Sequence, residues 1–178
     1  MWETKEPKPA KLIVGMLAPD DRCLKAATDK LAATFGTVDL ASDIWPFEKT
    51  SYYQKEIGTT ILRQFVSLER LLDPGRLAAA KHQTNRLEQD LAASLALPVP
   101  RPVNLDPGLI EASKLVLATT KNYSHRIYIG DRMYAEVTLV FDTGQWEPMP
   151  YTYPDYRQAC YHEFFSQVRN RLVEQLRH

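Results

Sequence analysis

The chain has 178 residues, of which 44% are apolar and 25% are charged, as in a globular domain large enough to bury a core. Its 22 Lys and Arg residues balance 22 Asp and Glu residues, so it lacks the basic excess of a dedicated nucleic-acid binder. Its two cysteines are far apart and lack C-x-x-C spacing, so they indicate neither a disulfide framework nor a zinc ribbon.

The first ten residues, M-W-E-T-K-E-P-K-P-A, are polar and rich in proline, and they predict a flexible arm over residues 1–10. A single α+β domain is predicted over residues 11–178. The start of the chain lacks the apolar core of a signal peptide, and no apolar run reaches the length of a membrane span. We therefore expect a cytoplasmic protein with no membrane partner.

Strand and helix signals alternate in the first half of the chain. The apolar run at residues 11–17 predicts a buried strand, and Pro19-Asp20-Asp21 begins a helix that ends at Gly36. Further extended segments are predicted over 38–41, 52–57 and 60–69. Asp73-Pro74 then caps a helix whose buried stripe runs from Leu77 to Leu95.

The second half predicts a meander between two helices. Asp106-Pro107-Gly108 repeats the Asp-then-Pro cap and predicts a short helix through about Ser113. Extended segments follow over 115–119, 126–129, 133–141 and 145–149. A long helix from about Asp155, with Cys160 in it, closes the chain. The expected architecture is a mixed, largely antiparallel sheet with a C-terminal meander, packed by about three main helices.

A hairpin within this meander has a register that its apolar residues determine. A three-residue loop over 130–132 pairs Ile127 with Ala135 and predicts one buried face. That face comprises Ile127, Ile129, Ala135, Val137, Leu139 and Phe141. On the opposite face, Arg126 lies across from Glu136. It is interpreted either as a solvated sheet face with one ion pair or as a polar floor for a ligand.

Known catalytic and nucleotide-binding motifs are absent. The chain contains no G-x-x-x-x-G-K-[ST], G-x-G-x-x-G, N-K-x-D, H-E-x-x-H or G-x-S-x-G. Polar residues instead gather in R-P-V-N-L-D-P-G (101–108) and in T-T-K-N-Y-S-H-R (119–126). The predicted helix beginning at Pro107 would aim free N–H groups at an anion beside these basic residues.

We therefore predict a site for an anionic ligand. Its predicted ligand-binding residues are Arg101, Asn104, Asp106, Lys114, Lys121, Arg126 and Glu136. Glu136 is expected to orient Arg126, and His125 is the candidate catalytic acid–base residue if chemistry occurs. Asp106 by itself is explained more simply as a helix cap. Glu56 and Glu136 form a second, weaker candidate, a carboxylate pair near His125 for acid–base or metal chemistry. No metal site is predicted in the binding set, and no cofactor is indicated.

Several stretches of the chain resemble a bacterial family catalogued only as a domain of unknown function. They are K-L-I-V-G (11–15), Y-Q-K-E-I-G (53–58), K-H-Q-T-N (81–85) with Glu88, R-P-V-N-L-D-P-G (101–108), K-L-V-L-A-T-T-K (114–121), S-H-R-I-Y (124–128), Y-A-E-V-T (134–138) and T-Y-P-D-Y (152–156). Some members of that family carry an automatic GTP-binding label. The resemblance implies little about activity, and this chain lacks the phosphate loop on which such a label normally rests.

Two hypotheses follow. The first is a small-molecule-binding protein, or an enzyme, acting on an anionic ligand that is phosphorylated or nucleotide-like. The second is a non-enzymatic interaction module that uses the aromatic loops at 45–47 and 145–154, unless their aromatics anchor the loops to the core. Whether the protein is an enzyme, which ligand it binds and its oligomeric state stay open from sequence.

Overall fold

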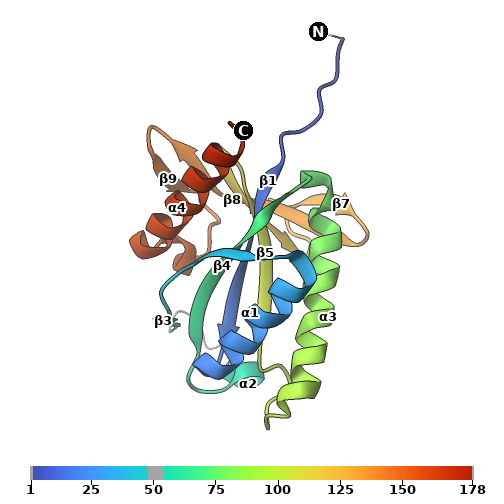
Figure 1. Cartoon of the computed structure of the whole chain (residues 1–178), viewed down its shortest axis with the longest axis vertical. Helices are drawn as coiled ribbons and strands as arrows, with labels where there is room; N and C mark the ends of the chain where they lie inside the picture. Colours follow the sequence, from blue (N-terminus) through green and yellow to red (C-terminus); the bar gives the residue numbers. More distant parts are fainter. Residues whose placement is uncertain (1, 48–53, 178) are drawn as a thin grey trace.

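The computed structural model describes residues 2–47 and 54–177 (Figure 1). Within these residues it contains one nine-stranded sheet and three long helices, which confirms the predicted α+β class and the number of main helices. The strands are β1 (Ala10–Ala18), β2 (Val38–Ala41), β3 (Trp45–Pro46), β4 (Leu62–Leu72), β5 (Asn104–Ile110), β6 (Lys114–Thr119), β7 (Ile127–Gly130), β8 (Met133–Asp142) and β9 (Gln145–Pro148). The helices are α1 (Asp21–Phe35), α2 (Gln54–Ile57), α3 (Leu77–Leu95) and α4 (Ala159–Gln175), with 3-10 turns at Pro74–Arg76 and Pro154–Arg157.

The sheet is built around β1. The strand order is β2-β4-β1-β5-β6-β8-β7, with β3 beside β4 and β9 beside β8, and every pairing among the described strands is antiparallel. All nine residues of β1 are buried, because strands flank it and helices cover both of its faces. The continuous apolar run at 11–17 is confirmed as this central strand.

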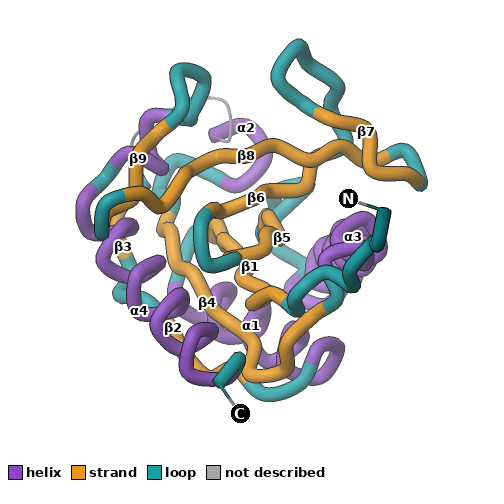
Figure 2. Tube along the Cα trace, turned by 90° about the horizontal axis from the view of Figure 1, so that it is seen from above, coloured by secondary structure: helices purple, strands orange, loops and turns teal. Residues whose placement is uncertain are grey.

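Helices cover opposite faces of the sheet (Figures 1 and 2). On one face α1 and α3 pack against alternate β1 residues such as Leu12 and Val14. On the other face α4 packs against Ile13 and Phe65. Two apolar cores, one on each side of the sheet, follow from this strand alternation.

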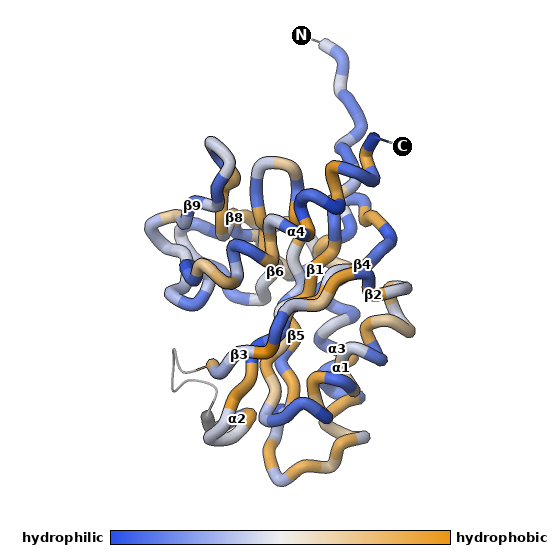
Figure 3. Tube along the Cα trace, turned by 60° about the vertical axis from the view of Figure 1, so that its left-hand side comes forward, coloured by the Kyte–Doolittle hydropathy of each residue, from blue (hydrophilic) through white to orange (hydrophobic). Residues whose placement is uncertain are grey.

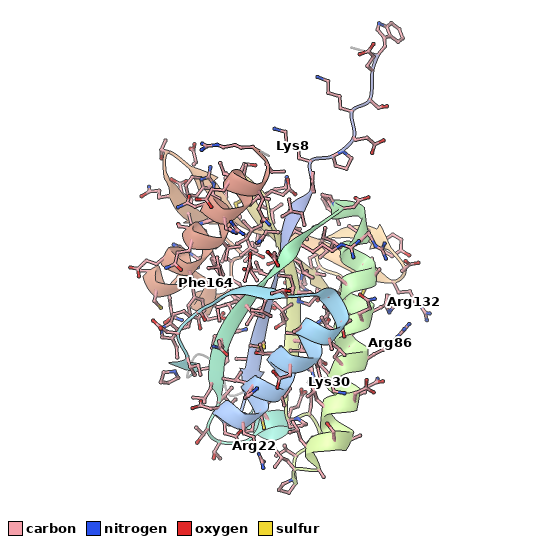
Figure 4. All side chains as sticks on the ribbon, viewed as in Figure 1. Lys8, Arg22, Lys30, Arg86, Arg132 and Phe164 are labelled. Atoms are coloured by element: carbon pink, nitrogen blue, oxygen red, sulfur yellow. The ribbon has the colours of Figure 1, made fainter. Side chains whose placement is uncertain are left out.

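Helix α1 begins where the sequence predicts, whereas the predicted start at Asp73-Pro74 is a 3-10 turn that leads into α3 at Leu77. The side chain of Asp20 accepts a hydrogen bond from the N–H of Cys23 (2.8 Å), and Asp73 accepts one from the N–H of Gly75 (2.8 Å). Cys23 faces the core, where burial raises its pKa to about 11. Lys30 on α1 and Arg86 on α3 point outward in Figure 4.

The segment before β1 contains no helix or strand over residues 2–9, and those residues are exposed. Figure 1 shows it extending from the sheet beyond the end of β1, and Figure 3 colours it mostly as hydrophilic. Within the two described ranges, no helix combines the length and apolarity needed to cross a membrane.

A buried lysine ties the first strand to the last helix. Lys11, on β1, is fully buried, and its ammonium forms an ion pair with Asp39 of β2. It also donates to the side-chain oxygen of Gln175 on α4 (2.7 Å). The second oxygen of Asp39 accepts from the hydroxyl of Ser67 on β4 (2.6 Å). Burial alone would raise the pKa of Asp39, but Lys11 and Ser67 hold it below its ordinary value.

The predicted helix over 106–113 is wrong, because Asn104–Ile110 forms strand β5. Asp106 lies opposite Gly15 of β1, so it is a strand residue rather than a helix cap. The helix N-terminus predicted at Pro107 is therefore absent, and it cannot attract an anion beside Arg101. Pairing with β1 along the whole of β5 overrides the local Asp-Pro signal.

The predicted extended segment over 52–57 is also wrong where the structure describes it. Gln54–Ile57 forms the short helix α2, while Tyr52 and Tyr53 lie outside the described residues. The next predicted segment, 60–69, is confirmed from its third residue onward as part of β4.

The predicted meander is confirmed, with two corrections at its hairpin. Ile127 pairs with Ala135 as expected, but Gly130 pairs with Met133, so the tip is two residues long and the register shifts between Tyr128 and Gly130. Ile127 is 71% exposed rather than buried, because it lies at the start of the sheet's edge strand.

The opposite face of the hairpin, for which a solvated face and a polar floor were both considered, is covered at Glu136 and Thr138. Glu136 and Thr138 are buried. The chain after β9 folds over them, with the hydroxyl of Tyr151 donating to the carbonyl of Val137 (3.0 Å). Glu136, on this covered face of β8, also lines the candidate site.

Candidate functional site

The sheet is split between β5 and β6. These strands pair over only three residue pairs, Gly108–Leu117, Leu109–Val116 and Ile110–Leu115. Beyond Gly108 they diverge and leave a cavity of about 830 Å³ between them. Its lining comes from α3, from both diverging strands and from the 3-10 turn before α4. This volume lies within the range of small-molecule sites.

Pro107 and Gly108 determine where the split begins. An added Cβ at Gly108 would lie 2.6 Å from a methyl carbon of Leu117 and 2.8 Å from the carbonyl oxygen of Val116, so glycine is required where the strands touch. Pro107 lacks the N–H that a continuing β5–β6 ladder would use. The ladder therefore ends at these two residues.

Two side chains of α3 take the place of the missing strand partner. The N–H of Leu105 donates to the carboxylate of Glu88 (2.6 Å), and the carbonyl of Leu105 accepts from the ammonium of Lys81 (2.9 Å). Lys81 and Glu88 are seven residues apart, which places them on one face of the helix, two turns apart. They satisfy backbone groups that would otherwise be buried without partners.

Glu88 also binds Arg101, which lines the cavity. The guanidinium donates from Nε and Nη2 to the Glu88 carboxylate (3.0 and 2.9 Å) and from Nη1 to Glu56 (3.3 Å). Burial raises the pKa of Glu88 above its ordinary value, although Arg101 and Lys81 act in the opposite direction. Arg101 thus belongs to an ion-pair network at the wall of the cavity.

Asn104 and Asp106 project from β5 into the same cavity. The amide of Asn104 donates to Asp106 (2.6 Å), and Lys81 lies 3.5 Å from the other Asp106 oxygen. Burial alone would raise the pKa of Asp106, but the charges of Lys81 and Arg63, with the Asn104 amide, hold it below its ordinary value. Asp106 is therefore ionised at neutral pH.

An Asp106→Asn variant should differ from the wild type in a pH-dependent way. Because the pKa of Asp106 is lower in the folded chain than in the unfolded chain, its contribution to stability is present above about pH 4 and is lost as pH falls through the folded value. Urea unfolding at a series of pH values should show the wild type's advantage shrinking below pH 4. An advantage that grew on acidification would contradict the assigned ionisation.

Arg63 occupies the inner end of the cavity. It stands opposite Leu17 of β1, whose other neighbour is Asn104 of β5. Gly15 leaves room for its guanidinium, since an added Cβ there would lie 2.9 Å from Nη1. Nη2 donates to Asp155 (2.9 Å), and this ion pair is almost completely buried. Burial raises the pKa of Asp155 in spite of Arg63.

The outer rim of the cavity is defined by Thr120, Lys121, Arg126 and Tyr153. The Arg126 Nε donates to the buried carboxylate of Glu136 (2.9 Å), as the sequence predicted. Its Nη2 donates to the hydroxyl of Tyr153 (3.3 Å), a residue that is 53% exposed. Burial alone would lower the pKa of Arg126, but Glu136 and Tyr153 raise it above its ordinary value. Arg126 is therefore positively charged at neutral pH.

His125 lies behind this rim rather than on the cavity wall. Its Nε2 is 2.9 Å from the same Glu136 oxygen that binds Arg126. Its ring stacks on Tyr151, with centroids 4.0 Å apart and planes 8° apart. In this geometry His125 positions Glu136, and through it Arg126.

The structure brings most of the predicted site residues together. Those that line the cavity are Arg101, Asn104, Asp106, Lys121, Arg126 and Glu136. Lys114 lies elsewhere, in an ion pair with Glu111 (2.7 Å) near the paired end of β6. Glu56 contacts Arg101 rather than joining Glu136 beside His125. No group of three or more His, Cys, Asp or Glu side chains within residues 2–47 and 54–177 is arranged to hold a metal ion.

Sequence reasoning missed several residues of this cavity. Arg63, Lys81, Glu88, Asp155 and Tyr156 line it and were not in the predicted set. For three of them, the sequence showed a charged residue at a position where the pattern predicts a buried apolar one. Lys81 and Glu88 lie beside the apolar face of α3. Arg63 lies between Ile61 and Phe65 at a position where every second residue is buried. A charged residue at a core position needs a buried partner or a site.

Aromatic residues of the two loops considered for partner binding are mostly folded back. Phe47 and Trp146 are buried, and the Trp146 indole N–H donates to the hydroxyl of Ser166 (3.2 Å). The ring of Trp45 packs 4.9 Å from that of Tyr161. Tyr153, on the outer rim, stays exposed. These contacts anchor the loops to the core.

Comparison with known proteins identifies a family without a described activity. No curated protein and no solved structure matched the chain. The model of a domain of unknown function, DUF4416, matched residues 8–172. That span contains every strand of the described residues and the cavity, together with α1, α3 and most of α4. The chain belongs to the DUF4416 family.

Proposed function

We propose that this protein binds a small anionic ligand, phosphorylated or nucleotide-like, in the cavity between β5 and β6. It acts either as a binding protein or as an enzyme on that ligand. The observation that carries the proposal is the cavity itself, about 830 Å³ in volume and lined largely by polar side chains from distant parts of the chain. Such a concave site with convergent polar groups is the usual form of a ligand pocket.

The charges of the lining support an anionic ligand. The cationic residues are Arg63, Lys81, Arg101, Lys121 and Arg126, and the acidic residues are Glu88, Asp106, Glu136 and Asp155. At the outer rim, Lys121 and Arg126 both line the cavity, beside the carboxylate of Glu136. A phosphate placed there meets two cations, and guanidinium groups bind phosphate oxygens well.

A thermal-shift screen tests this proposal. The probes are inorganic phosphate, ribose 5-phosphate and the four nucleoside 5′-monophosphates. A probe at about 100 times its Kd should raise the Tm by roughly 5–10 °C, from about 2.7 kcal/mol of linkage in a chain of this size. The combined Lys121→Gln and Arg126→Gln variant should lose most of that rise.

Lys114→Gln is the matched control, because Lys114 is a cation of the same sheet that does not line the cavity. It should keep the full rise in Tm. Failure of every probe to stabilise the wild type would count against the proposed function. So would a rise that persists unchanged in the double variant.

The alternative, a non-enzymatic interaction module, stays a prediction. The anchoring of Trp45, Phe47 and Trp146 removes the surface on which that hypothesis mainly depended. Light scattering of the purified chain over a range of concentrations would reopen it, if the mass rose above that of a 20.4 kDa monomer.

A further inference from the structure

Polar atoms without hydrogen-bond partners gather around Arg63, at the inner end of the cavity and next to it. Among the described residues they are Nε and Nη1 of Arg63 and the hydroxyls of Tyr156 and Tyr161. Arg63 is 3% exposed and Tyr156 is 4% exposed, and both line the cavity. Buried polar atoms in folded proteins are nearly always paired. Unpaired groups beside a cavity therefore point to a ligand atom that accepts hydrogen bonds.

The guanidinium of Arg63 is held in position for such an atom. Nη2 is fixed by Asp155, and the ring centroids of Phe47 and Phe65 lie 5.0 and 5.3 Å from the guanidinium carbon. Gly15 provides the space beside Nη1. A ligand that binds here does not have to order a mobile side chain, so little entropy opposes the contact.

The charge balance at the inner end decides what kind of acceptor fits. Asp155 matches the charge of Arg63, and Asp106 matches that of Lys81. A phosphate at this end would stand near both carboxylates. A neutral oxygen accepts from Arg63 without that repulsion, whereas a phosphate at the outer rim lies beside the cations Lys121 and Arg126.

We infer that Arg63 and Tyr156 bind a neutral oxygen, carbonyl or hydroxyl, of the ligand's head group while its phosphate lies at Lys121 and Arg126. This inference rests on the proposed function and adds an orientation and a ligand class. The class is a phosphomonoester with a neutral, oxygen-bearing head, which includes sugar phosphates and nucleoside monophosphates.

Calorimetric titration of the full chain tests the orientation. Inorganic phosphate, ribose 5-phosphate and the four nucleoside 5′-monophosphates are titrated into the wild type, Arg63→Lys, Tyr156→Phe and Tyr161→Phe. For the tightest phosphomonoester, Arg63→Lys and Tyr156→Phe should each weaken binding about tenfold, the usual cost of one lost hydrogen bond to a charged or buried group. The affinity for inorganic phosphate should not change.

Tyr161→Phe is the matched control, because its hydroxyl is also buried and unpaired but does not line the cavity. It should bind every probe as the wild type does. Tyr156→Phe removes no existing hydrogen bond within the described chain, so it should fold even if Arg63→Lys does not.

The outcomes separate the two proposals. Unchanged phosphomonoester binding in Tyr156→Phe would overturn the orientation and leave the proposed function standing. So would an equal loss of inorganic phosphate binding in Tyr156→Phe, or the same loss in Tyr161→Phe. If no probe binds the wild type, the proposed function fails and the orientation fails with it.

Discussion

Replacing Lys11 by Met is expected to lower the free energy of unfolding by about 3 kcal/mol, because it leaves Asp39 in a largely buried position without its main cation. This is the lower end of the range for breaking a buried pair, since Ser67 still donates to Asp39 and Arg171 lies 3.7 Å away. Urea denaturation followed by circular dichroism measures the change through the midpoint and the slope.

Lys25→Met provides the control for this variant. Lys25 is 76% exposed and pairs with Asp29 one helical turn away, so its loss should change stability by no more than about 0.5 kcal/mol. If the two lysine variants lost similar stability, the buried pair would contribute no more than a surface one. The link between β1 and α4 would then be incidental to the fold.

Replacing Gly108 by Ala is expected to cost about 2–3 kcal/mol, because the added methyl group meets the backbone carbonyl of Val116 as well as the side chain of Leu117. The Leu117 side chain can rotate away, but the carbonyl moves only if β5 and β6 separate. The same variant should weaken the binding of any ligand of the cavity, because the strands that form its walls would shift.

Gly75→Ala is a closely matched control, since the tripeptide Asp-Pro-Gly occurs at 73–75 and again at 106–108. The nearest atom to an added Cβ at Gly75 is a carboxylate oxygen of Asp73 at 3.3 Å, in an exposed turn. Its effect should stay within about 1 kcal/mol. Equal losses at the two glycines would mean that the strand contact at Gly108 is not tight.

The same repeated tripeptide shows how far local sequence predicts this fold. At Asp73 it caps the turn before α3, as predicted, whereas at Asp106 it lies within a strand. The local signals are equal, and pairing with β1 decides between them. By contrast, β1, α1 and α3 were predicted well because apolar period and caps agree along each of them.

The candidate site was predictable in part for a similar reason. The Arg126–Glu136 pair follows from the register of one hairpin, a short-range feature. Arg63 and Asp155 are 92 residues apart in sequence, and no local pattern relates them. Their meeting depends on which strands are neighbours in the sheet, and this is the information that a single sequence lacks.

Strands β5 and β6 are paired at one end and separated at the other. Three residue pairs join them up to Gly108, and beyond that point the side chains of Lys81 and Glu88 bind the free edge of β5. Long side chains can follow a moving backbone by changing rotamer, whereas ladder hydrogen bonds between strands have to break. Under the proposed function, the width of the opening can therefore adjust to ligands of different thickness while both halves of the sheet keep their internal pairing.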